Sequence, residues 1–141
     1  MKLKIVIDTN VLFEGLTNKN SPSSQVIDAL IFNKCKAYIC NALAYEYEDV
    51  LSRKLSKRRW SDLKPIFTDI LLKMHFTDIV IIISYRPSSP DPGDDHVIDC
   101  AVNSNSMIVT NNTKDFKLAK RTLGIKILKP ENFITLIGMY V

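Results

Sequence analysis

Short apolar runs alternate with longer amphipathic segments along this chain. The runs have the length of buried strands, which are expected at residues 3–8, 37–40, 79–83, 107–110 and 125–128. A helical period predicts a short helix directly after Asp8, and further helices over 23–33, 42–55, 61–75, 92–104, 113–121 and 130–138. This order predicts an α/β fold, a three-layer α/β/α sandwich around a mostly parallel central sheet of about five strands.

Residues with capping chemistry mark three of the predicted helix starts. Asn41 can cap the helix that follows the second apolar run. Asp91 followed by Pro92 has the same character before a later helix. Pro130 with Glu131 behind it is typical of the start of the last helix.

Length and composition indicate one globular domain over residues 1–141. A hydrophobic content of 46% with 24% charged residues argues against long disorder. The longest apolar run, Ile79 to Ile83, is too short to span a membrane, and the first run ends at Asp8 in a way that does not suit a signal peptide. We therefore expect a cytoplasmic protein.

Three cysteines form an odd set without CxxC spacing, which also indicates a reducing compartment. Cys40 falls in a predicted strand and Cys100 in a predicted helix, and packing is the favoured role for both. The cysteines and the two histidines lack the spacing of a zinc site, so none is expected.

A net charge of +4 and a pI near 9.0 suit a polyanionic partner without establishing one. The positive charge is concentrated in one segment that ends in an aromatic residue: Arg53, Lys54, Lys57, Arg58, Arg59 and Trp60. A solvated helix surface and a contact with a phosphate backbone explain this segment equally well.

Two acids are expected in apolar surroundings. Asp8 ends the first apolar run, so its carboxylate is expected at the carboxyl end of a parallel strand, where open α/β sheets place their chemistry. The inward face of a later helix is predicted to carry Leu43, Tyr47 and Val50. Glu46 shares that face, and a cation or metal ion explains its position better than an exposed helix edge does.

Two further acidic positions follow later in the chain. Asp95 and Asp99 are four residues apart on one face of a predicted helix. Asp95 could instead serve only to complement the helix dipole. For Asp99 three roles remain open: a direct ligand, a supporting contact to the ligands, or an acid exposed to solvent. Asn112 and Asp115 follow the fourth apolar run. Turn formation explains Asn112 as well as function does, whereas function is favoured for Asp115.

Together these motifs resemble those of PIN-domain proteins. They occur in the family's order: Ile7-Asp8-Thr9-Asn10-Val11-Leu12, Glu46-Tyr47-Glu48-Asp49-Val50-Leu51, Asp91-Pro92-Gly93-Asp94-Asp95 with its helix, and Thr110-Asn111-Asn112-Thr113-Lys114-Asp115-Phe116. The resemblance covers nearly the whole chain and is closest to the single-domain toxins of toxin-antitoxin pairs, the relatives of VapC. Each motif is weak alone, but four acidic motifs in this order are specific.

The resemblance implies a metal-dependent endoribonuclease that hydrolyses RNA phosphodiester bonds. The expected metal-binding and catalytic quartet is Asp8, Glu46, Asp95 and Asp115, with Asp8 and Asp95 as the central ligands. It would hold one or two Mg²⁺ or Mn²⁺ ions, which prefer oxygen ligands. The residues expected to support the carboxylates or the scissile phosphate are Thr9, Asn10, Thr110 and Asn112, with Asp99 as a further candidate.

Other expectations follow from the same resemblance. Many family members carry an acid where this chain has Asn112, so Asp115 would have to complete the site. Water activated by metal ions needs no histidine base, so His75 and His96 are expected to be bystanders. A homodimer and a small antitoxin partner are implied, and the basic segment with Trp60 is the candidate RNA contact, where the indole would stack on a base.

Two rival hypotheses remain. One is a PIN-like module that binds RNA or protein without cutting, which metal-dependent cleavage would exclude. The other is a phosphoaspartyl enzyme that uses Asp8, although such enzymes typically place a second aspartate two residues later, where this chain has Asn10.

Overall fold

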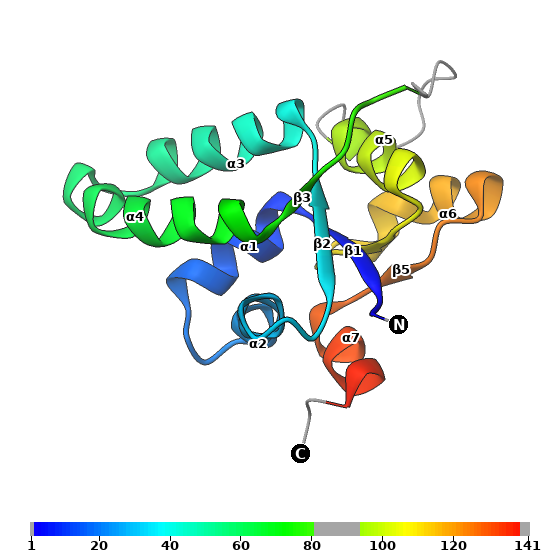
Figure 1. Ribbon diagram of the computed structural model, residues 1–141, viewed down its shortest axis with the longest axis horizontal. Coiled ribbons are helices and arrows are strands. Elements are labelled where there is room, and N and C mark those ends of the chain that lie inside the picture. Colours follow the sequence, from blue (N-terminus) through cyan, green and yellow to red (C-terminus); the bar gives the residue numbers. More distant parts are fainter. Residues whose placement is uncertain (1, 81–93, 139–141) are drawn as a thin grey trace.

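A five-stranded parallel sheet forms the centre of the computed structural model, which describes residues 2–80 and 94–138 (Figure 1). The strands are β1 (Lys4–Ile7), β2 (Lys36–Ile39), β3 (His75–Phe76), β4 (Met107–Val109) and β5 (Ile127–Leu128). Their order across the sheet is β3-β2-β1-β4-β5, and every neighbouring pair is parallel. The predicted α/β fold with a parallel central sheet is confirmed.

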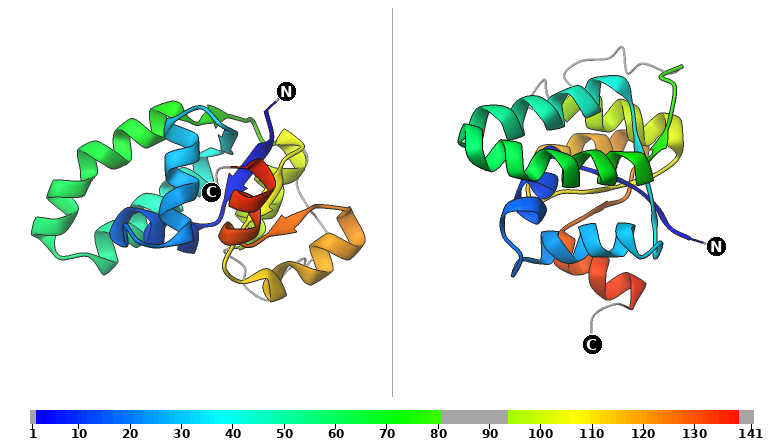
Figure 2. Two further views of the ribbon diagram at one scale, coloured as in Figure 1. Left: turned by 90° about the horizontal axis from the view of Figure 1, so that it is seen from below. Right: turned by 60° about the vertical axis from the view of Figure 1, so that its left-hand side comes forward.

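Helices cover both faces of this sheet. They are α1 (Thr9–Thr17), α2 (Pro22–Ile31), α3 (Asn41–Lys54), α4 (Lys57–Lys73), α5 (Asp94–Ser104), the 3₁₀ helix η1 (Thr113–Phe116), α6 (Lys117–Leu123) and α7 (Pro130–Ile137). In the right-hand view of Figure 2, α3, α4 and α5 lie on one side of the strands, and α2 and α7 lie on the other. Within the described ranges, no helix combines the length and apolar character needed to cross a membrane.

The central strand is buried on both faces. Ile5, Val6 and Ile7 are fully buried, as expected for a strand that helices cover from both sides. On one side α5 packs against β1, β2 and β4. This continuous apolar sequence is why β1 could be located from the pattern alone.

The third strand was predicted in the wrong place. It was expected over residues 79–83, but β3 is the pair His75 and Phe76, which follows α4 directly and pairs with the outer side of β2. Ile79 and Val80 are not in a strand, and residues 81–83 lie outside the described ranges. Both residues of β3 are exposed at the sheet edge, so they lack the apolar signature on which the prediction depended.

The helix starts also differ in part from the prediction. Pro130 is the first residue of α7, as expected. Cys40, not Asn41, is the N-cap of α3, and its side chain makes no capping hydrogen bond to the helix. The Ser56 hydroxyl accepts the Arg59 N–H and starts α4 four residues earlier than predicted. The expected cap at Asp91 lies outside the described residues.

The strand order creates a natural position for a site. From β1 the chain continues to β2 and β3 on one side, and then returns to place β4 on the opposite side of β1. At such a reversal the loops that follow the two strands diverge, which leaves a crevice beyond their carboxyl ends. Asp8 follows β1 at this point and Thr110 follows β4.

Candidate active site

Asp8 is a buried carboxylate that is fixed on both oxygens. Only 5% of the residue is exposed. Its Oδ1 accepts the backbone N–H of Thr9 at 2.8 Å, and its Oδ2 accepts the Thr110 hydroxyl at 2.6 Å. Its own N–H donates to the carbonyl of Val109 at 3.0 Å, which extends the pairing of β1 with β4. Asp8 is therefore held at the carboxyl ends of the two central strands.

Two hydrogen bonds fix the orientation of the Thr110 hydroxyl. Thr110 is fully buried, and its oxygen accepts the Asn112 N–H at 3.0 Å. Its single proton is donated to Asp8. The loop after β4 thus supports the carboxylate after β1, as expected for a supporting residue.

The environment raises the pKa of Asp8. Burial is the largest cause, and the negative charges of Glu46 and Asp115 add to it, while the hydrogen bonds from Thr110 and Thr9 act in the opposite direction. Three acids of the predicted quartet are thus within electrostatic reach of one another. A positive charge among them would relieve both the burial and the repulsion.

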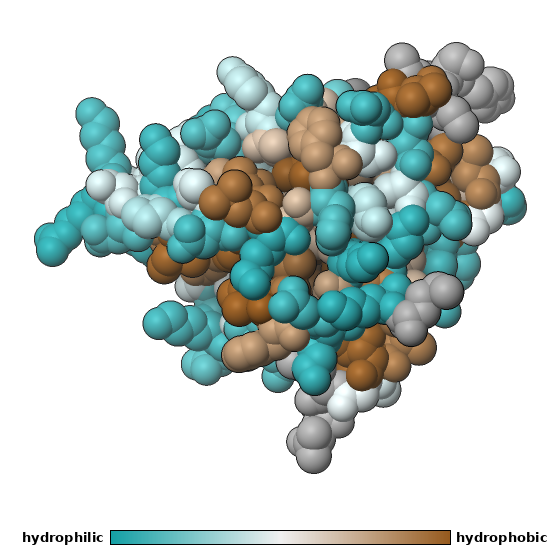
Figure 3. Space-filling view, viewed as in Figure 1, coloured by the Kyte–Doolittle hydropathy of each residue, from teal (hydrophilic) through white to brown (hydrophobic). Residues whose placement is uncertain are grey.

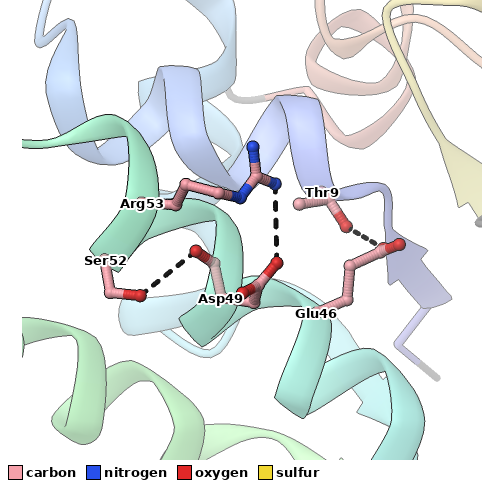
Figure 4. Close-up of polar contacts among 5 residues, drawn as sticks. All are labelled: Thr9, Glu46, Asp49, Ser52 and Arg53. Carbon is pink, nitrogen blue, oxygen red and sulfur yellow. Dashed lines mark hydrogen bonds and ion pairs between the residues drawn. The ribbon is translucent and has the colours of Figure 1, made fainter.

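Glu46 turns from α3 toward the start of α1. Its Oε2 accepts the hydroxyl of Thr9, the residue directly after Asp8, and its side chain is half-buried. Figure 4 shows this contact, and one turn further along α3 it shows Asp49 paired with Arg53 at 3.4 Å. Glu46 and Asp49 of α3 thus have different partners, and of these two acids it is Glu46 that faces the Asp8 turn.

Residues 112 and 115 differ in how they approach Asp8. Asp115 is half-buried in η1, its N–H donates to the Asn112 carbonyl at 3.0 Å, and its charge contributes to the raised pKa of Asp8. Asn112 is exposed, and its side chain does not cap η1. Its backbone N–H, not its amide, supports Thr110. Of these two residues, Asp115 is therefore the one whose charge acts on Asp8.

The two candidate acids of α5, Asp95 and Asp99, occupy different surroundings. Asp95 is half-buried in the first turn, and α5 packs against β1 and α3, the elements next to Asp8 and Glu46. Asp99 is buried and lines a cavity of about 350 Å³ together with Cys40 and His96. Because Asp99 is buried, it is not simply an acid exposed to solvent. The role of Asp95 as a metal ligand remains a prediction.

Two polar side chains near Asp8 were not identified from the sequence. Tyr47 is fully buried, and its hydroxyl donates to the carbonyl of Ile7, directly before Asp8. Burial, with the charges around it, raises its pKa, so it stays protonated as a donor. The sequence placed Tyr47 in an apolar stripe, but a buried tyrosine hydroxyl needs a partner, and that requirement was the available signal.

Glu14 is the second residue that was missed. Its Oε1 accepts the Ser23 hydroxyl at 2.5 Å and the Asn111 amide at 3.4 Å. The Asn111 N–H also reaches Oδ1 of Asn10 at 3.4 Å. Asn10 and Glu14 are four residues apart, so their shared helix face was the signal in the sequence.

The basic segment lies where α3 ends and α4 begins, away from the sheet (Figure 1). Its five cationic residues are exposed, and Figure 3 shows hydrophilic side chains projecting at this end of the molecule. Trp60 is half-buried and packs against Phe67, with ring centroids 5.8 Å apart. One face of the indole is thus engaged in the fold, and base stacking by Trp60 remains a prediction.

The donor set suits a hard divalent cation. Carboxylates and hydroxyls are the oxygen ligands that Mg²⁺ and Mn²⁺ prefer, and the raised pKa of Asp8 shows that its charge is not compensated. In residues 2–80 and 94–138, no three side chains of the histidine, cysteine, aspartate and glutamate types converge closely enough to hold an ion.

Comparison with known proteins agrees with this fold. A family model described as PIN domain matches residues 4–114. No curated protein matches the chain.

Several solved structures share the fold at low sequence identity. A VapBC2 complex from Rickettsia felis with a promoter DNA fragment matches with a TM-score of 0.65 at 16% identity, covering 90% of this chain and 98% of that one. DNA-bound VapBC from Salmonella typhimurium matches with a TM-score of 0.63 at 19% identity, covering 91% and 98%. FitAcB from Neisseria gonorrhoeae matches with a TM-score of 0.64 at 18% identity, covering 90% and 98%.

Proposed function

The chain belongs to the PIN domain family, and from this premise we propose that it is a metal-dependent endoribonuclease that hydrolyses RNA phosphodiester bonds. The observation that carries the proposal is the buried carboxylate of Asp8 at the carboxyl ends of β1 and β4, with Glu46 and Asp115 in electrostatic reach. A packing role does not account for this arrangement, because burying a charge beside other negative charges is unfavourable.

Each acid has a proposed role in holding Mg²⁺ or Mn²⁺. Asp8 and Asp95 would be the central ligands, while Glu46 and Asp115 would bind or position a second ion or its waters. A bound ion of this kind neutralises charge on the phosphate and lowers the pKa of water. The Thr110 hydroxyl and the Thr9 N–H both donate to the Asp8 carboxylate, which favours its charged form and fixes its orientation.

The test is cleavage of a mixed, structured RNA pool by purified protein with Mg²⁺, Mn²⁺ or EDTA. The native chain is compared with Asp8→Asn and Asp95→Asn. Asp69→Asn is the matched control, since Asp69 is exposed on α4 and the substitution changes charge and size in the same way. We expect metal-dependent cutting by the native chain and the control, and a loss of at least about 100-fold in both site variants.

Two outcomes would contradict the proposal. If Asp8→Asn still cuts RNA, the active site lies elsewhere in the chain or the activity belongs to a contaminating nuclease. RNA binding without cutting at any metal concentration would favour the alternative function, a PIN-like module that binds RNA or protein.

We also propose that the protein is the toxin of a toxin-antitoxin pair with a small antitoxin partner. The structural neighbours from Rickettsia felis and Salmonella typhimurium are VapBC assemblies bound to DNA, which supports this. Expression of the native chain alone in a bacterial host should arrest growth, and expression of Asp8→Asn should not. Equal growth with both chains, at equal protein levels, would argue against toxicity.

The proposed assembly is a homodimer. Sedimentation at micromolar concentration should give twice the chain mass of 16.0 kDa. A monomer under these conditions would contradict the proposal.

A further inference from the structure

A cavity of about 350 Å³ lies beside the candidate active site, at the carboxyl ends of β2 and β3. Cys40 and Thr77, which directly follow these strands, line one side of it, and residues of α5 line another. In the pairing of β1 with β2, Ile5 lies opposite Ala37, so Asp8 and Cys40 are each three residues further along adjacent strands. Neighbouring strands are about 4.8 Å apart, and the cavity therefore adjoins the crevice at Asp8.

The wall of the cavity that follows β3 is held at both ends. The Thr77 N–H donates to the Ile39 carbonyl at 2.8 Å, which extends the pairing of β3 with β2. Further along, the Val80 N–H donates to Oδ1 of Asn103 on α5 at 2.9 Å, and Figure 1 shows this segment passing from β3 toward α5. Ile79, between these two contacts, is half-buried and packs against the core. The cavity is therefore largely formed before a ligand arrives, as small-ligand sites usually are.

An exposed aromatic ring forms part of this wall. Phe76 lines the cavity and is 56% exposed, and Ile79 adds further apolar surface to the lining. An exposed phenylalanine ring can stack on a planar group, as aromatic side chains do in proteins that bind single-stranded RNA. The volume is close to the lower limit for small-ligand sites, roughly 300 Å³, which suits a single planar heterocycle.

The charged groups of the lining are hydrogen-bond acceptors. Asp78 and Asp99 both line the cavity, the first exposed and the second buried, and the described residues contribute no lysine or arginine to it. A carboxylate only accepts hydrogen bonds, and a phosphate would find no permanent positive charge there. The cavity therefore favours an uncharged planar group that donates hydrogen bonds.

Among the bases of RNA, guanine fits this lining best. Its N1–H and its N2 amino group point the same way, so both oxygens of one carboxylate can accept from it at once. Uracil offers a single N–H between two carbonyl oxygens, which a carboxylate repels. Asp78 is the candidate acceptor because it is exposed to an incoming ligand. Asn41, the first residue of α3, also lines the cavity, and its amide can donate to O6 of guanine.

We propose that this cavity binds one base of the RNA substrate beside the scissile phosphate, that Phe76 stacks on this base, and that Asp78 selects guanine. The inference rests on the proposed function, because it names the nucleotide that the same site would recognise. Phe76 and Asp78 would determine specificity without taking part in the chemistry, since neither belongs to the four acids proposed to hold the metal ion.

Binding without cleavage tests the cavity by itself. Fluorescein-labelled uridine octamers that carry guanosine, adenosine, cytidine or uridine at one central position are titrated with the native protein in EDTA, and fluorescence anisotropy gives each Kd. We expect the guanosine octamer to bind at least about fivefold more tightly than the all-uridine octamer, the lower end of what one bidentate contact to a base edge contributes. Equal affinity for all four octamers, or no binding of the guanosine octamer, would overturn the proposal.

Variants assign the two roles. Phe76→Ala should weaken binding of the guanosine octamer at least about fivefold through loss of one stacked base, whereas Phe76→Tyr should keep the affinity because it keeps the ring. Asp78→Asn should remove most of the preference for guanosine over uridine. Phe32→Ala is the matched control, because Phe32 is 66% exposed and precedes β2, at the other end of that strand. An affinity in Phe76→Ala equal to that of the control, or an unchanged preference in Asp78→Asn, would overturn the corresponding role.

Cleavage with Mg²⁺ or Mn²⁺ separates this inference from the proposed function. Fragments of a mixed RNA pool should end next to guanosine with the native chain and with Phe32→Ala, and should lose this preference with Asp78→Asn. Metal-dependent cutting with the same distribution of bases in all three chains would overturn the inference and leave the nuclease proposal intact. Guanosine-specific binding without cutting at any metal concentration would contradict the nuclease proposal and leave the base-binding cavity intact.

Discussion

Asp8 carries its charge at the expense of stability. Its folded-state pKa lies above the ordinary value of 3.8, chiefly because of burial. A group with a raised folded-state pKa binds its proton more tightly when folded, so the free energy of unfolding decreases as pH rises from the unfolded pKa through the folded one. Asp8 therefore destabilises the metal-free protein at neutral pH, as expected for a residue retained for function.

Asp8→Asn is expected to stabilise the metal-free chain at pH 7, because it removes a buried charge beside Glu46 and Asp115. Urea unfolding in EDTA measures the change. The gain should shrink as pH falls toward 4, where Asp8 takes up a proton. A destabilised variant at pH 7, or a gain independent of pH, would show that the charge is compensated in the folded state.

Thr110→Val is expected to weaken both stability and cleavage. The substitution keeps the shape but removes the hydroxyl that donates to Asp8 and accepts from Asn112, so it should cost about 1–3 kcal/mol. Loss of orientation of Asp8 should lower kcat/KM at least about tenfold. Thr122→Val on the exposed surface of α6 is the matched control. If Thr110→Val keeps the kcat/KM of the native chain, Thr110 does not contribute to the active site.

The elements that the sequence located correctly have local signatures. The strand before Asp8 is a continuous apolar run, and Glu46 interrupts a helical stripe. That stripe proved to be Leu43, Tyr47 and Leu51, while Val50 is only half-buried. Periodicity thus finds the helix and its approximate face, but it does not fix the rotation of the helix to within one residue.

Long-range contacts are where the sequence pattern is insufficient. Thr110 and Asp8 are 102 residues apart, and no local pattern reveals that one donates to the other. The exposed edge strand β3 has no apolar run, so its position beside β2 could not be read from the sequence pattern either. Residue types at strand ends predicted the acids, but only the packing shows their partners.

The crossing of α1 and α2 depends on a glycine. A Cβ on Gly15 would lie 2.7 Å from Cγ1 of Ile27 and 2.8 Å from the carbonyl oxygen of Ser23. Gly15→Ala should therefore destabilise the protein by about 1–3 kcal/mol in urea unfolding, against the roughly 1 kcal/mol that alanine normally gains within a helix. An unchanged or raised urea midpoint of unfolding would mean that α1 and α2 can move apart at little cost in free energy.

The start of α4 is the element-level test of RNA binding. Replacing Lys57, Arg58 and Arg59 with glutamine should weaken binding of single-stranded RNA. The plot of the logarithm of the binding constant against the logarithm of the salt concentration should also become shallower. Its slope should change by about 0.7 for each phosphate that the protein no longer neutralises. Neutralising Lys117, Lys120 and Arg121 on α6 removes the same charge elsewhere and is the matched control. An equal weakening in both variants would indicate nonspecific attraction instead of a defined RNA-binding surface.

The four acids of the proposed site come from four separate segments of the chain. The turn after β1 supplies Asp8, α3 supplies Glu46, α5 carries Asp95, and η1 supplies Asp115. These segments are linked through the packing of α3 and α5 and the pairing of β1 with β4. A ligand that joins the acids would therefore stabilise the fold as a whole.

Divalent metal should raise the Tm of the native chain. An ion that binds only the folded state stabilises it by about 2.7 kcal/mol at 100 times its Kd, because unfolding must first release it. Differential scanning fluorimetry with Mg²⁺ or Mn²⁺ against EDTA measures the shift, with Ca²⁺ and added NaCl separating coordination from general screening. Asp8→Asn should start from a higher Tm in EDTA and gain little from metal, so the two melting curves should approach or cross as metal is added. Equal gains in the native chain and in Asp8→Asn would mean that the ion binds away from the crevice, even if cleavage proved to be metal-dependent.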